Sequence, residues 1–547
     1  MFRRLVRVAA VCSLSLVVAG FVAAASEAPN SNRAIDIETG RRIVSTQKLK
    51  MHLSFIASDE LEGRGTPSRG LDLAARYIAS HLEYYGYQPA GDEGSYYQRI
   101  SMSRRKPSKE SLVRIQAGDK SVEFRLGTDF LGAGSIATGK LAFAGYGAVS
   151  QEAGYDDYAG LDVKDKLVVV FDGYPKGMNQ DAFKAERKFG NRTVKVALSK
   201  FLIARERGAV GSITIKAPEY SAAKDGAPSP FQRALPSLDR ESTVFDFHDT
   251  TQPTNIELTA EAAARLQDVL GIDLAAVRAK IDETQKPQPT PIDASFETAF
   301  KHDVLEKIYT QNVLGFLEGS DPVLKDEIIA FSAHYDHLHP LPAPPAGPPA
   351  SGDAKPKDRI YNGADDDGSG TVGILTLAEA FAAVQRPRRS VLFIWHAGEE
   401  RGLIGSDYYV RNPTKPLAKI ASLINIDMIG RNFGDKDENA DHVYLVGAAR
   451  TSADLRELIV KTTGDRLRLD ETDARNYFGR SDHFHYARNR VPVAFFCTGE
   501  HKDYHQLSDE VHAILFDKMK RILDVVFECG LELANRDARP AFTGQGF

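Results

Sequence analysis

The feature that most constrains this chain is a regular alternation of apolar, strand-like runs and helical segments after about residue 296. The runs are IIAFSA (328–333), VLFIWHA (391–397), LINIDM (423–428), VYLVG (443–447) and VPVAFFC (491–497). Near-continuous apolar strands that alternate with helices are typical of a largely parallel sheet covered on both faces. We therefore predict an α/β fold with a mainly parallel mixed sheet flanked by helices, formed chiefly by residues 291–547.

The chain has 547 residues, which is too many for one ordinary core. Residues 26–132 are predicted to be the N-terminal part of the same domain. In that part, apolar residues recur at helical spacing from Leu71 to Leu82, directly after the loop-like ASDELEGRGTPSRG (57–70). Residues 133–290 have a different texture, with short β-rich runs and polar turns. This pattern predicts a small β-rich domain inserted into the chain.

The first 25 residues have the layout of a secretory signal peptide. A positively charged start is followed by an apolar run from Val8 to Ala23 and by the small-residue site Ala23-Ala24-Ala25. The run is short for a membrane span, and no stop-transfer segment follows it. We expect residues 1–25 to be removed and the protein to be periplasmic or secreted in a bacterial envelope, without a membrane anchor.

Bulk composition excludes several classes of protein. The chain is 42% hydrophobic and 26% charged, which is typical of a soluble globular protein, and its net charge of −5 gives no basic field for nucleic acid. Only Cys497 and Cys529 follow the predicted leader. One disulfide between them is possible, but two cysteines cannot form a disulfide framework.

Histidines and acids stand where the predicted strands end. In open α/β sheets, ligands bind beyond the carboxyl ends of the strands, so these side chains are expected to converge on one edge. They are His334, Asp336, Glu399, Glu400, Asp427, the triplet Asp365-Asp366-Asp367 before a helix, and His505 after the last strand.

So many carboxylates cannot crowd together as anions without a strong positive charge. Histidine and carboxylate ligands without cysteine suit zinc, with manganese or cobalt as substitutes. A pair of ions sharing a carboxylate would polarise a scissile carbonyl and lower the pKa of a water molecule. A glutamate beside the metals, but not bound to them, would then move the proton. The pair Glu399-Glu400 offers one glutamate of each kind.

Each element also has a plain structural interpretation. A His-x-Asp pair is usually a surface or capping pair, Asp-rich turns before helices are commonly N-caps, and adjacent glutamates are usually solvated. The joint arrangement at one sheet edge favours the metal site.

These motifs together resemble the co-catalytic zinc aminopeptidases, a family that also contains glutamate carboxypeptidase, the transferrin receptor and glutaminyl cyclase. The resemblance covers about 296–535 and reaches back to SDELEGRG (58–65). The motifs are AHYDHL (333–338), NGADDDGSG (362–370), AGEERGLIGS (397–406), NIDMIG (425–430), GRSDH (479–483) and YHQLSD (504–509).

The resemblance implies two Zn²⁺ ions and a role for each residue. His334 and Asp427 would hold one ion, Glu400 and His505 the other, and Asp366 would bridge them. Spacing alone does not select Asp366 from its triplet.

The same resemblance makes Glu399 the general base, while Asp336 would orient the ring of His334. His337 and His339 are interpreted as loop residues.

Substrate and oxyanion contacts are expected from four residues near the GRSDH motif. Some members have a tyrosine where this chain has Phe478, so the oxyanion role stays open between Tyr477 and Arg480. Asp482 and His483 are assigned a substrate-pocket or structural role. The Pro-rich loop 340–350 either borders the cleft or is an inert linker.

The inserted region resembles a protease-associated domain. The similarity rests on AGYG (144–147), YDDYAGLDVKDKLVVV (155–170) and RGAVGSITI (207–215). Such a domain implies a role as a lid or in substrate access.

The predicted function is that of an exported di-zinc aminopeptidase acting on peptides. The alternatives are a carboxypeptidase of the glutamate-releasing kind, a glutaminyl cyclase, or a receptor-like binding protein that has lost catalysis. Every ligand position and the base are filled, which favours an enzyme. A carboxypeptidase needs an arginine cluster for the substrate carboxylate, whereas an aminopeptidase needs acidic or carbonyl groups for the free amine. The sequence leaves this choice and the oligomeric state open.

Overall fold

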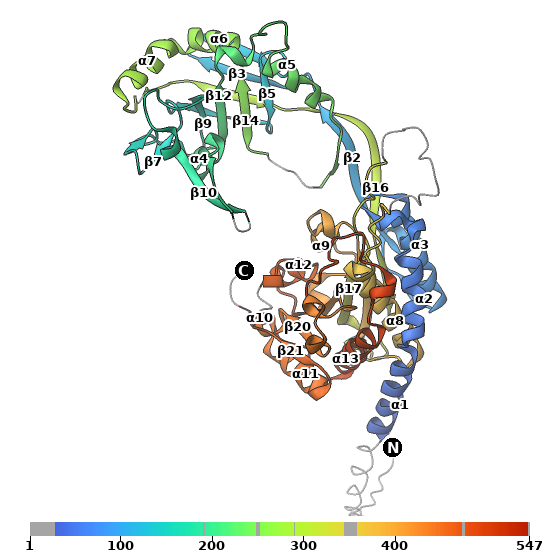
Figure 1. Ribbon diagram of the computed structural model, residues 1–547. Helices are drawn as coiled ribbons and strands as arrows, with labels where there is room; N and C mark the ends of the chain where they lie inside the picture. The colour runs from blue at the N-terminus through green and yellow to red at the C-terminus, as the bar shows by residue number, and fades with distance from the viewer. Residues whose placement is uncertain are drawn as a thin grey trace, which may run out of the picture. The chain divides into compact units, whose positions relative to one another are not determined.

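The computed structural model describes residues 28–189, 192–247, 252–288, 290–343, 358–472 and 476–544 (Figure 1). The predicted signal peptide and most of the Pro-rich loop lie outside these residues. The chain forms two compact units: unit 1 comprises Met1–Ile100 and Tyr309–Phe547, and unit 2 comprises Ser101–Ile308.

Unit 2 is larger than the predicted insertion of residues 133–290. Its eight-stranded sheet has the order β4-β3-β15-β6-β9-β12-β14-β5. Three strands of that sheet lie outside the predicted boundaries: β3 (Leu112–Ala117), β4 (Lys120–Arg125) and β15 (Ser295–Ala299). They extend the unit because their backbone groups pair with each other and β15 also pairs with β6 (Ala137–Phe143). The remaining strands are β5 (Phe130–Ala133), β9 (Leu167–Phe171), β12 (Gly211–Ile215) and β14 (Thr254–Leu258).

Unit 1 is built on a mixed sheet whose centre is parallel. Four neighbouring strands run in the same direction, in the order β18 (Ser390–His396), β17 (Ile328–His334), β19 (Ile420–Ile426) and β22 (Val493–Cys497). β16 (His302–Leu317) pairs antiparallel to β18, while β20 (His442–Val446) pairs antiparallel to β22 and parallel to β21 (Arg468–Asp470). The α/β class predicted from the sequence is confirmed.

Most residues of the central strands are apolar because helices cover both faces of the sheet. Phe331 and Phe393 belong to the core cluster on the face covered by α8 (Gly370–Ala383) and α13 (Phe516–Asn535). Ala330 and Leu392 belong to a second cluster on the opposite face, where α9 (Ile404–Arg411) and α12 (His483–Arg488) pack. Successive residues of a strand point to opposite faces of the sheet, so a strand covered on both faces needs apolar side chains on both.

The N-terminal helices complete unit 1. α1 (Ala28–Ile43), α2 (Thr46–Ile56) and α3 (Arg69–Tyr84) contact α8, which lies beside them in Figure 1. The helix predicted from the spacing of Leu71 to Leu82 is confirmed as α3. It begins there because the Ser68 hydroxyl accepts a hydrogen bond from the Leu71 N–H and caps the first turn.

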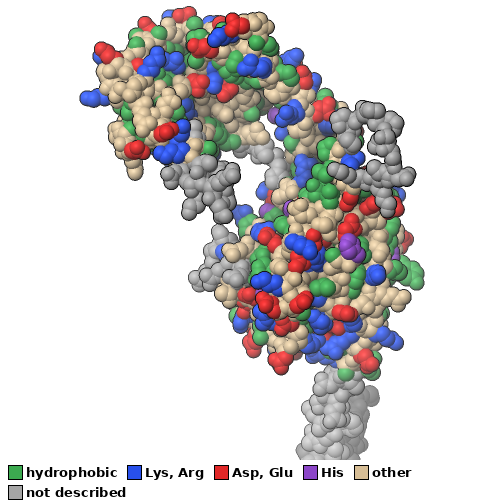
Figure 2. Space-filling model, viewed as in Figure 1, with side chains coloured by type: hydrophobic (Ala, Val, Ile, Leu, Met, Phe, Trp, Pro, Cys, Tyr) green, Lys and Arg blue, Asp and Glu red, His purple; other side chains and the backbone are tan. Residues whose placement is uncertain are grey.

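The distribution of charged side chains and the state of the two cysteines can be compared with what the composition predicts. Acidic and basic side chains are interspersed over the face of unit 1 that Figure 2 shows. Within the described ranges, no helix combines the length and apolar character needed to cross a bilayer. Cys497 and Cys529 are both buried and free, so the possible disulfide does not form.

Candidate metal centre

The predicted residues converge because the central strands are parallel and end at the same edge. His334 is the last residue of β17, Asp427 directly follows β19, and Glu399 and Glu400 lie on a short turn after β18. His505 lies in the loop that follows β22. Residues that are far apart along the chain therefore meet in one place.

Hydrogen bonds to backbone N–H groups distinguish the three carboxylates of the acidic triplet Asp365-Asp366-Asp367. Asp365 Oδ1 accepts from the N–H of Gly430 at 2.6 Å, and Asp367 Oδ1 accepts from the N–H of Gly370 at 2.8 Å. The carboxylate of Asp366 instead faces imidazoles, and the peptide bond between Asp366 and Asp367 is cis. Asp365 and Asp367 thus fix the turn, and Asp366 is left to act as a ligand.

The two oxygens of Asp366 face two separate sets of ligand atoms. Oδ1 lies 3.3 Å from His334 Nε2, which is also 3.6 Å from Asp427 Oδ1. Oδ2 lies 3.0 Å from His505 Nε2, which is also 3.2 Å from Glu400 Oε2. Ligands about 2.0–2.1 Å from a tetrahedral zinc ion are themselves about 3.4 Å apart, so both sets fit such an ion.

Unsatisfied polar atoms give an independent indication of cations. Asp366 Oδ2 and His505 Nε2 are buried, and neither has a hydrogen-bond partner in the described part of the chain. Buried polar atoms are normally paired, so orphaned atoms that face each other are expected where an ion belongs. Two groups of candidate ligands lie close together, one of His337, Asp366, Glu400 and His505 and the other of His334, Asp367 and Asp427. Asp366 Oδ1 also lies 3.3 Å from His334 Nε2, so the residues present fit divalent ions on both sides of Asp366.

The electrostatics of the centre also favour positive charge. Burial lowers the pKa of His505, but the carboxylates of Asp366 and Glu400, 3.0 and 3.2 Å from Nε2, outweigh burial and raise it to about 10. Burial likewise opposes protonation of His334, yet the negative charges of Glu399 and Asp427 raise its pKa well above the usual value. Carboxylates that hold two imidazoles protonated would bind cations in their place.

Asp336 orients His334 through its backbone rather than its carboxylate. His334 Nδ1 donates to the carbonyl oxygen of Asp336 at 3.1 Å, which leaves Nε2 free for a metal. The carboxylate of Asp336 has other donors: Oδ1 accepts from the Glu399 N–H at 3.1 Å and Oδ2 from the Thr66 hydroxyl at 3.0 Å. Asp336 therefore positions both a ligand and the predicted base.

His337 is the residue that the sequence interpretation missed. Its side chain is buried, and Nδ1 donates to Glu400 Oε1 at 2.8 Å, which leaves Oε2 facing His505. Gly363 makes room for the ring, since a Cβ there would lie 2.6 Å from it. The only signal in the sequence was its place three residues after His334, which does not distinguish it from an exposed loop residue.

Removing the imidazole in a His337→Ala variant is expected to weaken binding of one of two zinc ions by about tenfold to a hundredfold, because Glu400 loses the donor that orients it. Competition against a chromophoric chelator measures this. His339→Ala is the matched control. In the described part of the chain, His339 Nε2 forms a hydrogen bond to the Thr66 carbonyl oxygen at 3.2 Å and not to a predicted metal ligand. Unchanged affinity in His337→Ala would contradict the role.

A small pocket opens onto the ligands. Besides the predicted ligands His334, Asp366, Glu400 and Asp427, its lining includes Tyr477, Arg480, Glu500 and Tyr504. Arg480 donates to Glu500 at 2.7 Å and lies over the ring of Tyr477, 5.3 Å from its centre. Of the four residues predicted to contact substrate, Tyr477 and Arg480 reach this pocket.

Asp482 and His483 do not line this pocket. Both are fully buried, and His483 begins α12, with its ring 4.6 Å from that of Phe495. Burial raises the pKa of Asp482 to about 7. The sequence predicts either a substrate-pocket or a structural role for these two residues, and their burial where α12 packs against the sheet favours the structural one.

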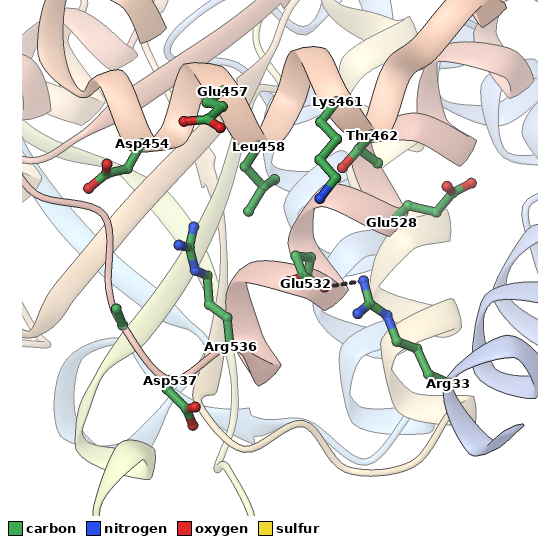
Figure 3. A pocket seen from close by; sticks show the side chains of 11 residues that line it. Arg33, Asp454, Glu457, Leu458, Lys461, Thr462, Glu528, Glu532, Arg536 and Asp537 are labelled. Carbon is green, nitrogen blue, oxygen red and sulfur yellow. Dashed lines mark ion pairs between the residues drawn. The ribbon is translucent and has the colours of Figure 1, made fainter. Parts of the chain in front are cut away.

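A larger hollow of about 770 Å³ lies elsewhere on unit 1, between α1, α11 (Ala453–Thr463) and α13 (Figure 3). Its walls are mostly charged, and an ion pair between Arg33 and Glu532 lies at its edge. None of the predicted site residues lines it. Size alone therefore does not identify the functional site.

The chain is similar to curated aminopeptidases over part of its length. Leucine aminopeptidase 2 of Trichophyton rubrum is 30% identical over 199 residues, covering 36% of this chain and 35% of the relative. Aminopeptidase Y of Saccharomyces cerevisiae is 29% identical over 229 residues, covering 39% and 37%. The chain thus spans little more than a third of the length of the curated relatives it matches.

Among solved structures, an aminopeptidase from Aneurinibacillus sp. strain AM-1 superposes with a TM-score of 0.46 and 16% identity, over 93% of this chain and 99% of that one. Residues 312–529 match the model of peptidase family M28. These residues contain all the proposed ligands and Glu399. Over this part of its length, the chain is therefore similar to peptidase family M28.

Proposed function

We propose that this protein is a di-zinc aminopeptidase that removes residues from the N-termini of peptides. The observation that carries the proposal is the carboxylate of Asp366, whose two oxygens face two separate sets of ligand atoms. Zinc ions held there would polarise the scissile carbonyl and make a water molecule more acidic.

Glu399 is the proposed general base. It lines the pocket but belongs to neither set of ligand atoms. Burial, together with the charges of Asp427 and Asp482, raises its pKa well above the usual value, so it holds a proton readily. In the proposed reaction Glu399 accepts a proton from water and passes it to the leaving amine. Its N–H is held by Asp336, which fixes the turn that presents its side chain.

The lining of the pocket supports cleavage at the amino end. Five acids line the pocket, namely Asp366, Glu399, Glu400, Asp427 and Glu500. Arg480 is the one arginine among the described residues that line it, and it is paired with Glu500. A substrate carboxylate would require an unpaired cationic side chain, and the paired Arg480 does not supply one. This favours an aminopeptidase over a glutamate-releasing carboxypeptidase, and the second ligand set disfavours a single-zinc glutaminyl cyclase.

Chelation is expected to abolish hydrolysis of an aminoacyl-nitroanilide, and added zinc is expected to restore it, because the ligands alone supply no Lewis acid. The measurement is nitroaniline release before and after dialysis against a chelator. Hydrolysis that is indifferent to the chelator would contradict the proposal.

The end specificity needs a separate measurement. Matched peptides with free and blocked N-termini, followed by mass spectrometry, should show shortening only from the free amino end. Shortening from the carboxyl end would instead establish a carboxypeptidase.

We propose export on the basis of residues 1–25, whose layout is that of a signal peptide. Residues 133–290, which lie within unit 2, are the proposed protease-associated domain, on the similarity of the motifs at 144–147, 155–170 and 207–215. Peptides are the proposed partners.

A further inference from the structure

Arg64 is a buried arginine whose partners are backbone carbonyl groups. Its side chain is fully buried within unit 1. Nε donates to the carbonyl oxygen of Tyr335 at 3.0 Å, Nη1 to that of Asn362 at 2.7 Å, and Nη2 to that of Gly363 at 3.0 Å. Nη1 also donates to the carbonyl oxygen of Ile56, at the end of α2.

These carbonyl groups belong to the two loops that carry the metal ligands. Tyr335 lies between His334 and Asp336, while Asn362 and Gly363 directly precede the acidic triplet. A planar guanidinium has several N–H groups in a fixed arrangement, so one side chain can hold two loops at a defined separation.

The backbone around Arg64 is fitted to the same loops. The carbonyl oxygen of Arg64 accepts from the His337 N–H at 3.3 Å. A Cβ at Gly63 would lie 2.4 Å from the carbonyl oxygen of Leu338 and 2.8 Å from that of Tyr361, so only glycine fits there. Gly63 has a φ of +76° and Arg64 a φ of +57°, which places Arg64 in a conformation that side chains disfavour.

The charge of Arg64 also suits this place. Burial lowers the pKa of Arg64 to about 10, while Asp336, Asp509 and Asp366 favour its charged form. A buried cation near these acids offsets part of their mutual repulsion before any metal is bound.

We infer that Arg64 is a positioning residue for the metal centre, holding the loop of His334 to His337 and the loop of the acidic triplet at the separation that two ions require. The inference rests on the proposed function. It also gives the segment SDELEGRG (58–65), which lies more than 200 residues before the other ligand motifs, a specific task at the site.

The test compares Arg64→Lys, Arg64→Met and the control Arg69→Met, which changes an exposed arginine at the start of α3. Zinc affinity is measured by chelator competition, and melting temperature is measured with and without zinc. Lysine keeps the charge but cannot span the same carbonyl groups. We expect Arg64→Lys to fold and to bind zinc about 10- to 100-fold more weakly, Arg64→Met more weakly still, and Arg69→Met like the wild type.

Two results would overturn the inference. One is wild-type zinc affinity in Arg64→Lys. The other is failure of Arg64→Lys to fold without zinc, because Arg64 would then stabilise the fold and not the metal centre. Failure of the proposed function would be visible separately, since the wild-type chain would then bind no stoichiometric pair of zinc ions.

Discussion

Replacement of Glu399 by glutamine is expected to lower kcat by about 10²–10⁴-fold while leaving the zinc content unchanged. Glutamine has the same shape but cannot accept a proton from water. Glu399 belongs to neither set of ligand atoms, so its loss does not remove a metal ligand. Turnover of an aminoacyl-nitroanilide and metal analysis of the same preparation measure the two quantities together.

The neighbouring glutamate provides the matched control. Glu400 Oε2 lies 3.2 Å from His505 Nε2, within the second set of ligand atoms. Glu400→Gln makes the same chemical change one residue away, yet it is expected to lower zinc content as well as rate. If Glu399→Gln retained wild-type turnover, Glu399 would not be the base. If it lost zinc as Glu400→Gln does, it would be a ligand.

Removal of the carboxylate that is proposed to bridge two ions, in Asp366→Ala, is expected to abolish binding of both ions and to reduce turnover to that of the chelated enzyme. Each ion would be left with two protein ligands, His334 with Asp427 and Glu400 with His505, whereas catalytic zinc sites use three. The zinc content, determined by metal analysis, should fall from about two ions per chain to well below one.

The number of zinc ions that Asp366→Ala retains tests the bridging role of Asp366 more directly than the loss of activity does. A carboxylate that served only one ion would leave the other bound after Asp366→Ala, and one zinc ion per chain would be found. That result would rule out the bridge. Asp454→Ala, at the exposed start of α11, is the matched control and should retain both ions. Circular dichroism establishes that both variants are folded.

Local pattern was sufficient to predict the fold of the main domain. β17, β18 and β19 are buried on both faces, so most of their residues are apolar, and such runs are visible without any knowledge of the partner strands. The edge that carries the site follows from the parallel arrangement. The boundaries of unit 2 did not follow, because β3 and β15 join its sheet through hydrogen bonds between segments about 180 residues apart.

The sequence by itself determined that His334, Glu399, Glu400, Asp427 and His505 would meet, since each follows an apolar strand at the ligand-binding edge. Only the tertiary structure decided the finer roles. It separated Asp366 from Asp365 through the N–H of Gly430, 65 residues away, and it brought His337 to Glu400. The physical reason is that strand burial is encoded locally, whereas the direction of a carboxylate depends on donors supplied by distant segments.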